Sequence, residues 1–340
     1  MNQKLLSLYL IAIAIAFPAS GKVKNKHKSE EAQEESTGKV HPVLWRNPSD
    51  ISSRNLFYGP GGKEHEPHST YTFVKEDLSG SNPKFVVRDE IGVEWKVKMG
   101  AEAKPETVAS RLVWAVGYLA NEDYFVADLR VQGLPSHLHR GQNRVSPDGL
   151  VHAVRLKRDP KDEKKVGNWH WRQNVFTGTR ELNGLRVMMA MINNWDLLDE
   201  NNAIYAEKGS QDRIYMVSDL GASFGTAGAT WPLTKSKGNL ASYRHSKFIT
   251  KTKPEYVSFE EPGPPSLLWF FYLKDYFRRW PMRRIGRNIP RADVKWIGDL
   301  LGQLSPDQIR DAFRAAGYSS QEVDGFAGVV QERIAALKAL

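Results

Sequence analysis

The chain has 340 residues, of which 41% are hydrophobic and 26% are charged, and it contains no cysteine. These proportions are ordinary for a soluble globular protein, and the length leaves room for one large domain or two lobes. The lack of cysteine excludes disulfides, a thiol nucleophile and a cysteine-bound metal. The formal net charge of +9 favours an anionic partner such as a nucleotide, but the basic residues are scattered and predict no nucleic-acid partner.

The first 20 residues have the pattern of a secretory signal peptide. Lys4 supplies a positive start, residues 5–17 are apolar and small residues follow at 18–21. An apolar run of this length is too short to span a bilayer comfortably, because a span takes about 20 residues. We therefore expect export, either to the periplasm of a bacterial envelope or by secretion, with an uncleaved anchor as the alternative. No second apolar run is long enough to predict a transmembrane domain.

The remainder of the chain divides into three parts. Residues 21–40 are rich in Lys, Glu, Ser and Gln, which predicts a disordered tether. Residues 41–135 are expected to form a β-rich N-lobe with one helix, and residues 136–340 a mainly helical C-lobe that carries the catalytic and metal loops. This order predicts an α+β fold of two lobes with a ligand cleft between them.

Periodicity and turn chemistry predict the individual elements. Strands are expected over 71–74, 84–88, 93–99, 124–131, 150–156, 203–205 and 213–217, with a charged connector over 158–166. Helices are expected from 104 to near Gly117, and over 180–193, 266–278, 291–301, 306–316 and 320–337. Ser305 and Gln308 predict a capping box, and the polar, Gly-rich stretch over 225–243 suits a mobile loop.

Two charged side chains of the N-lobe are candidates for holding phosphate. Lys98 ends the strand over 93–99, and Glu106 lies in the first turns of the following helix. Phosphoryl transfer uses a lysine that neutralises phosphate and a helix glutamate that holds this lysine. Lys96 shares a strand face with Lys98, and Glu102 competes with Glu106, so both alternatives stay open.

Two later loops supply the remaining candidates. Asp196 and Asn201 are five residues apart in a loop that follows an apolar helix and precedes a short strand, which is the spacing of a kinase catalytic loop. Asn202 is the alternative to Asn201. Asp219 follows the strand over 213–217, in the segment VSDLG, where a second metal ligand is expected.

In this order the motifs resemble those of the atypical protein-kinase-like superfamily, which includes HipA-type kinases, phosphatidylinositol 3/4-kinases and CotH-type kinases. The segment 78–84, LSGSNPK, resembles the loop that covers the phosphates in HipA-type kinases. The helix that carries Glu106, the loop over 194–201 and the SDLG step at 218–221 are similar to the corresponding motifs. The likeness covers roughly residues 70 to 225. Leu198 stands where the group usually has His, and Asn82 replaces Gln.

The resemblance implies a kinase-like fold, binding of ATP with Mg²⁺ or Mn²⁺, and transfer of phosphate to a hydroxyl of a protein, sugar or lipid head group. It implies that Glu106 positions Lys98 on the phosphates and that Asp196 orients the acceptor. Further phosphate contacts are expected from Ser79, Gly80, Ser81 and Lys84, and metal contacts from Asn201 and Asp219. The alternatives are a catalytically inactive pseudokinase-type binding protein of the cell envelope and a nucleotidyl (AMP) transferase on the same fold.

Overall fold

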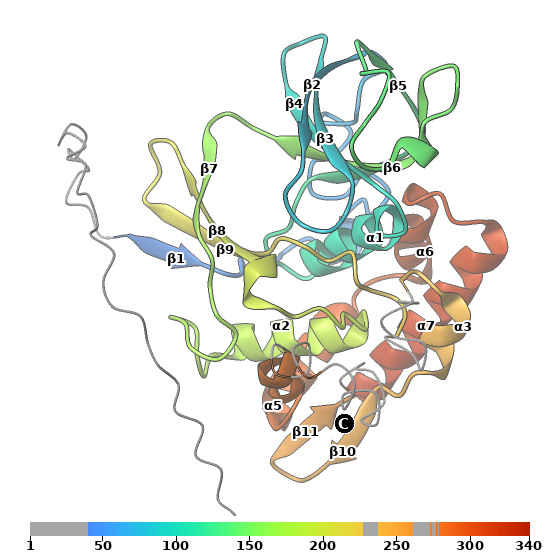
Figure 1. Cartoon of the computed structure of the whole chain (residues 1–340). Helices are drawn as coiled ribbons and strands as arrows, with labels where there is room; N and C mark the ends of the chain where they lie inside the picture. The colour runs from blue at the N-terminus through green and yellow to red at the C-terminus, as the bar shows by residue number, and fades with distance from the viewer. Residues whose placement is uncertain (1–39, 227–236, 261–272, 274–276, 278) are drawn as a thin grey trace, which may run out of the picture. The chain divides into compact units, whose positions relative to one another are not determined.

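Five strands of the N-terminal part form a closed barrel in this computed structural model (Figure 1). The structure describes residues 40–226, 237–260, 273, 277 and 279–340. The barrel order is β2-β3-β4-β6-β5, and a short parallel pairing of β2 with β5 closes it. The strands are β2 Tyr71–Asp77, β3 Lys84–Asp89, β4 Glu94–Met99, β5 Asp123–Gln132 and β6 Leu150–Asp159.

Alternation along β4 explains which side chains fill the barrel. Trp95, Val97 and Met99 are buried in the barrel core, while Lys96 and Lys98 lie on the other face of the strand. Helix α1, Ala103–Ala115, packs against β5 and β6 on one side and against the C-terminal helices on the other. Because α1 covers the barrel at the end of β4, a lysine there is buried beside the helix.

A second sheet has the order β1-β9-β8-β7 and brings two loops together. Its strands are β1 His41–Val43, β7 Glu163–Gly167, β8 Asn202–Glu207 and β9 Asp212–Val217. Asn202 at the start of β8 is paired with Val217 at the end of β9. The loop before β8 and the loop after β9 therefore meet at one end of this hairpin.

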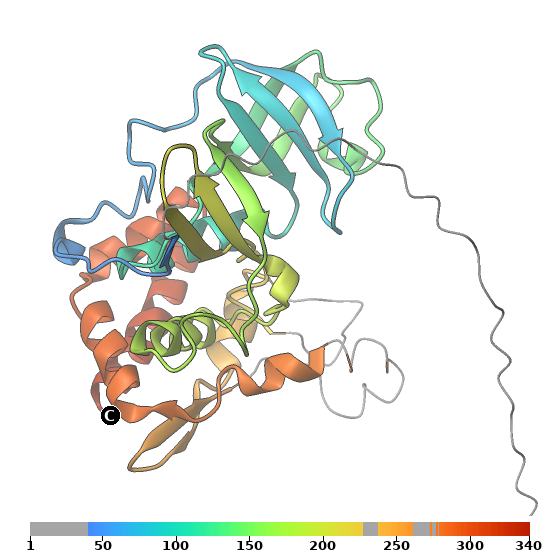
Figure 2. The ribbon, with the colours of Figure 1, turned by 90° about the vertical axis from the view of Figure 1, so that its left-hand side faces the viewer.

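The C-terminal part is built mainly from helices that share one large core (Figure 2). The helices are α2 Arg180–Met191, α3 Leu240–His245, α5 Arg291–Leu301, α6 Pro306–Ala315 and α7 Ser320–Lys338. Helix α5 packs against α2 and α7, and α6 packs against α7 and α1. The predicted capping box of Ser305 and Gln308 is present at the start of α6. Short 3₁₀ helices are η1 Ile51–Ser53, η2 Gln142–Arg144, η3 Asp199–Asn201 and η5 Trp280–Arg284.

One expectation about secondary structure was wrong. The charged connector over 158–166 contains the end of β6 and the strand β7, because β7 gains its hydrogen bonds from β8 and needs no apolar pattern of its own. The mainly helical stretch after residue 217 also contains a three-stranded sheet, formed by β10 Ile249–Thr252, β11 Tyr256–Phe259 and β12 Ile289–Pro290. These strands are too short to show a period.

The described residues confirm the predicted α+β fold. The barrel includes β6, which lies beyond the boundary expected at residue 135, since sheet pairing joins segments across that point. The expected signal peptide and tether, most of the helix over 266–278 and part of the loop over 225–243 lie outside the described residues. Among the residues that the structure describes, no helix is both long enough and apolar enough to cross a membrane.

Two helical glycines differ in their surroundings and give a test of the helix packing. A Cβ atom at Gly184 in α2 would lie 2.5 Å from Oη of Tyr118 and 2.6 Å from the Trp296 ring, whereas one at Gly328 in α7 would meet nothing within 4 Å. We expect Gly328→Ala to raise the free energy of unfolding by up to about 1 kcal/mol through helix propensity. We expect Gly184→Ala to lower it by about 1–3 kcal/mol through overpacking. Urea unfolding of both variants measures the difference, and a stabilising Gly184→Ala would contradict this packing.

Candidate functional site

The ammonium group of Lys98 lies among three carboxylates. Its Nζ atom is 2.6 Å from Oε2 of Glu102, 3.0 Å from Oε2 of Glu106 and 3.1 Å from Oδ1 of Asp219. The Lys98 side chain is 4% exposed and that of Asp219 is 39% exposed. Because a buried charge is costly without partners of opposite sign, these groups depend on one another. We call the four residues the Lys98 cluster.

Separate segments of the chain supply the cluster. Lys98 is near the end of β4, and the turn after it leads into α1, where Glu106 follows Glu102 by about one helical turn. Asp219 comes just after β9, and its carboxylate accepts a hydrogen bond of 3.1 Å from the backbone N–H of Gly221. The barrel, the helix and the second sheet therefore meet at this point.

A second buried cation, Arg155, holds the far side of Glu106. Arg155 on β6 is the direct cross-strand partner of Lys98 on β4. Lys98 donates a hydrogen bond to Oε2 of Glu106 and Arg155 donates one to Oε1, and both bonds are 3.0 Å long. Arg155 is also 3.5 Å from Oδ1 of the buried Asp123. With both carboxylate oxygens bound to cations, Glu106 has a single defined position.

The charges in the cluster act on the pKa values of its members. Burial works to lower the pKa of Lys98, but the three carboxylates outweigh burial and raise it above the ordinary value. Burial works to raise the pKa of Asp219, but the Lys98 ammonium lowers it to about 2. Burial raises the pKa of Glu106 in spite of the two cations on it. At neutral pH Lys98 is therefore charged and Asp219 ionised.

The loop of Asp196 is tied to the same place through Asn201. The Asn201 side chain donates a hydrogen bond of 2.7 Å from Nδ2 to the carbonyl oxygen of Asp196. The carbonyl of Asn201 accepts from the backbone N–H groups of Ser218, at 2.8 Å, and Asp219, at 3.2 Å. The Asp196 carboxylate forms an ion pair of 3.0 Å with Arg279. Asn201 thus links the loop before β8 to the turn that carries Asp219.

Two of the three alternative residues, Lys96 and Asn202, point elsewhere, whereas Glu102 belongs to the Lys98 cluster together with Glu106. The Lys96 side chain is 43% exposed and forms an ion pair of 2.8 Å with Asp159. Asn202 is buried and donates a hydrogen bond of 3.0 Å to the carbonyl of Trp169. Of each pair, Lys98 and Asn201 are the members that lie at the cluster.

The expected phosphate loop forms the turn between β2 and β3. Ser79, Gly80 and Ser81 are exposed, and none of them contacts the Lys98 cluster. The ammonium of Lys84, at the start of β3, donates a hydrogen bond of 3.2 Å to Oγ of Ser79 in this turn. Asn82 connects this turn with the cluster by a hydrogen bond of 2.6 Å from Nδ2 to Oε2 of Glu102.

The oxygen atoms of the site suit a hard divalent cation. Oxygen atoms of Glu102, Glu106 and Asp219 lie within 4.8 Å of one another, and Mg²⁺ and Mn²⁺ prefer such carboxylate and amide oxygens. Glu106 is engaged on both oxygens by cations, so Asp219, which is more exposed, is the better ligand. Asn201 lies next to it through the shared backbone hydrogen bonds. The residues present therefore fit a metal held by Asp219 and Asn201.

Three residues around the cluster were missed by the sequence reasoning. They are Arg155, Lys237, which forms an ion pair with Glu102, and Arg279. Two of these cations lie near the Trp195 ring, Lys237 at 5.8 Å and Arg279 at 5.4 Å from its centre. For Arg155 a signal was present, because an arginine within the apolar strand sequence HAVRL needs a buried partner. Nothing in the local sequence marks the other two.

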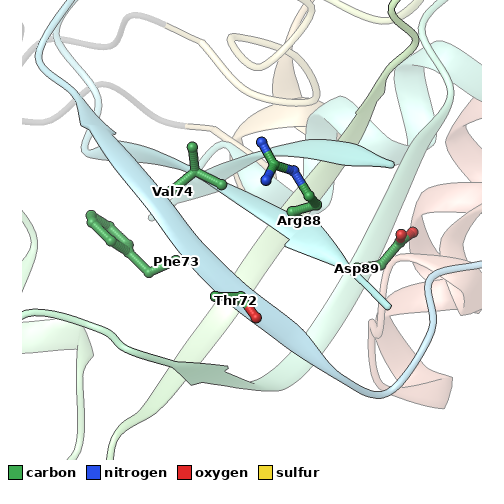
Figure 3. A pocket seen from close by; sticks show the side chains of 5 residues that line it. All are labelled: Thr72, Phe73, Val74, Arg88 and Asp89. Carbon is green, nitrogen blue, oxygen red and sulfur yellow. The ribbon is translucent and has the colours of Figure 1, made fainter. Parts of the chain in front are cut away.

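The structure also forms a pocket of about 410 Å³ on the barrel, away from the cluster (Figure 3). Thr72, Phe73 and Val74 of β2 and Arg88 and Asp89 of β3 line it. Its charged groups are used within the fold: Arg88 pairs with a glutamate on β4, and the Asp89 carboxylate accepts from two backbone N–H groups and a buried tryptophan. This pocket is therefore not the candidate site.

The pairing of Arg155 with Glu106 can be tested by stability. We expect Arg155→Met to lower the free energy of unfolding by about 3–5 kcal/mol, because it leaves a buried carboxylate with one cation fewer. Adding Glu106→Gln removes that charge, so the double variant should be more stable than Arg155→Met alone. Urea unfolding followed by circular dichroism measures both.

Arg130→Met serves as the matched control on β5. Arg130 is 63% exposed and pairs with Asp148 at 3.3 Å, and an exposed pair contributes at most about 1 kcal/mol. A loss for Arg155→Met no larger than that for Arg130→Met would show that the buried pair does not hold this part of the fold.

Comparison with known proteins gives little further information. No protein-family model matches this chain, and no curated protein matches it by sequence. Among solved structures, it is similar to a chain described as the crystal structure of a Helicobacter pylori proinflammatory kinase, CtkA. The two are 10% identical, with a TM-score of 0.45, over 80% of this chain and 97% of that chain. Similarity at this level carries no argument about function, which must come from the site.

Proposed function

We propose that this protein is an ATP- and divalent-metal-dependent phosphotransferase that acts on a hydroxyl group. The observation that supports it best is the meeting of Lys98, Glu106 and Asp219, although Lys98 and Asp219 are 121 residues apart in the chain. A lysine held by a helix glutamate, next to an aspartate that follows a strand, is the arrangement that binds phosphate and metal in phosphoryl transfer.

Each member of the site has a role in this proposal. Lys98 neutralises the phosphates of the nucleotide, and Glu106, fixed by Arg155, positions Lys98. Asp219 and Asn201 would hold a Mg²⁺ or Mn²⁺ ion, which supplies positive charge to the phosphate oxygens when it is bound. Asp196 orients the hydroxyl of the acceptor.

The proposed reaction moves the γ-phosphoryl group of ATP to the acceptor hydroxyl. The acceptor oxygen forms a bond to the γ-phosphorus, and the bond between this phosphorus and the β–γ bridging oxygen breaks. ADP leaves with the electron pair, and the proton of the hydroxyl passes to the Asp196 carboxylate. Lys98 stabilises the charge that develops on the phosphate side.

One observation favours a second function, that of a catalytically inactive binding protein. Asp196 is paired with Arg279 at 3.0 Å, and the loop carries the buried Leu198 where the resemblance leads one to expect His. The Arg279 guanidinium thus competes with an acceptor hydroxyl for the Asp196 carboxylate. A third possibility, nucleotidyl transfer of AMP, uses the same phosphate and metal groups and differs in the phosphorus attacked.

Nucleotide binding is the first test of the proposal. We expect ATP with Mn²⁺ to raise the melting temperature of the wild type, since a ligand at 100 times its Kd adds about 2.7 kcal/mol of stability. Asp219→Asn should lose this shift, because it removes the charge of the proposed metal ligand, and a chelator should remove the shift from the wild type. Thermal-shift titration measures all three.

Asp311→Asn is the control, because Asp311 lies on α6 and forms its ion pair with Arg314 on the same helix. It should keep the full shift. An equal shift in Asp219→Asn and the wild type would contradict the metal assignment, and no shift in the wild type would contradict the proposed function.

Labelled ATP separates the three functions. Transfer of label from γ-³²P-ATP to a hydroxyl-bearing acceptor, or to the chain itself, is expected of a phosphotransferase. Transfer from α-³²P-ATP instead would assign nucleotidyl transfer. Binding without transfer of either label would favour the inactive binding protein.

We also propose that the protein is exported through its N-terminal signal, and that it works in the periplasm or outside the cell. The support is the positive, apolar and small-residue pattern of residues 1–20. Expression of the full chain in a bacterium, followed by fractionation and mass spectrometry, should find a new N-terminus near residue 21 in the exported fraction. An intact chain in the cytoplasm would contradict export, and an intact chain in the membrane would favour the anchor.

A further inference from the structure

The Glu102 carboxylate occupies a place where three donors converge. Its Oε2 accepts a hydrogen bond from Nδ2 of Asn82 and lies next to Nζ of Lys98, both at 2.6 Å. Its Oε1 accepts a hydrogen bond from Nζ of Lys237. The Glu102 side chain is 8% exposed, so its charge depends on these donors for stabilisation.

The three donors belong to different parts of the site. Asn82 is in the turn between β2 and β3, Lys98 is on β4, and Lys237 is in the segment that precedes α3. Gly221, in the turn after Asp219, gives the carboxylate room, since a Cβ there would lie 2.7 Å from Glu102. An amide and two ammonium groups around one anion form the kind of site that also binds a phosphate group.

While Glu102 is in place, the N–H donors of Lys98 are all occupied by carboxylates and none is left for a phosphate. An ammonium has three N–H donors, and oxygens of three carboxylates lie within 3.1 Å of its nitrogen. Glu106 is held on its other oxygen by Arg155, and Asp219 is the proposed metal ligand. Glu102 is the remaining carboxylate, and its other partners are the amide of Asn82, in the turn between β2 and β3, and the ammonium of Lys237, before α3.

We propose that Asn82, Lys98 and Lys237 form a phosphate-binding site, and that Glu102 occupies this site when no nucleotide is bound. The inference rests on the proposed function. It adds Asn82 and Lys237 as phosphate ligands and Glu102 as an anion that competes with the nucleotide. Binding exchanges one anion for another, so the two ammonium groups keep a partner of opposite charge. The displaced carboxylate of Glu102 turns toward solvent.

The proposal predicts opposite effects for the anion and its donors. Glu102→Gln keeps the size of the side chain and removes the competing charge, so we expect it to bind Mn·ATP and Mn·ADP about 10-fold more tightly than the wild type. Lys237→Met and Asn82→Ala should each weaken binding about 10-fold, the order of a charge-assisted hydrogen bond. Isothermal titration calorimetry measures the affinities.

Two control variants match the charges that are removed. Lys104→Met alters a lysine of α1 whose ammonium bonds the carbonyl of Gly317. Glu122→Gln alters a glutamate that pairs with His65 and Arg158. Both should bind nucleotide like the wild type. Circular dichroism and the melting temperature show whether each variant is folded, and Lys237→Met keeps the test decisive if Glu102→Gln does not fold.

The outcomes separate this inference from the proposed function. If the wild type binds Mn·ATP but Glu102→Gln binds no more tightly, or Lys237→Met binds as well as the wild type, the inference is overturned and the proposed function stands. Weaker binding by Glu102→Gln would overturn it in favour of Glu102 as a metal ligand. If the wild type does not bind and Glu102→Gln does, the inference stands, while nucleotide binding by the native chain, which the proposed function needs, is contradicted. If neither binds, both are overturned.

Discussion

A buried ammonium group surrounded by carboxylates organises this protein. The Lys98 side chain is almost fully buried, and a charge in that position is stable only when opposite charges compensate it. The compensation comes from the first turns of α1 and from the turn after β9. The barrel, the helix and the hairpin of β8 and β9 must therefore keep one relative arrangement, because a shift of any of them leaves charges unpaired.

The groups around this lysine fall into an inner and an outer set. Glu106 and Arg155 form the inner set: they are bonded to each other at 3.0 Å, and both oxygens of Glu106 accept from buried cations. Glu102 and Asp219 form the outer set: Glu102 also accepts from Asn82 and Lys237, which lie outside the strands, and the Asp219 side chain is 39% exposed. A fixed inner set suits the proposed site, in which the lysine is held in place while an anionic ligand exchanges with an outer carboxylate.

The second sheet positions the remaining residues of the candidate site. Pairing of β8 with β9 places Asn201 beside the turn of Asp219, and the Asn201 amide holds the backbone of Asp196. Hydrogen bonds to backbone groups, rather than side-chain charges, therefore set the distance between the loop of Asp196 and the turn of Asp219. The ion pair of Asp196 with Arg279 is the contact on which the proposed phosphotransferase and the proposed binding protein differ.

The sequence alone determined the elements with strong local signals, and the tertiary structure decided which charges meet. The helices α5 and α6 begin and end close to the residues expected, because helical period, Pro at the first turn and the capping box of Ser305 act within a few residues. Spacing also singled out Lys98, Asp196, Asn201 and Asp219. It did not distinguish Lys98 from Lys96, which share a strand face, because only the cover provided by α1 makes one of them buried. Nor did it find Arg155 or Lys237, since each acquires its role from a carboxylate brought close by folding, and the free energy of a charge depends on neighbours in space rather than along the chain.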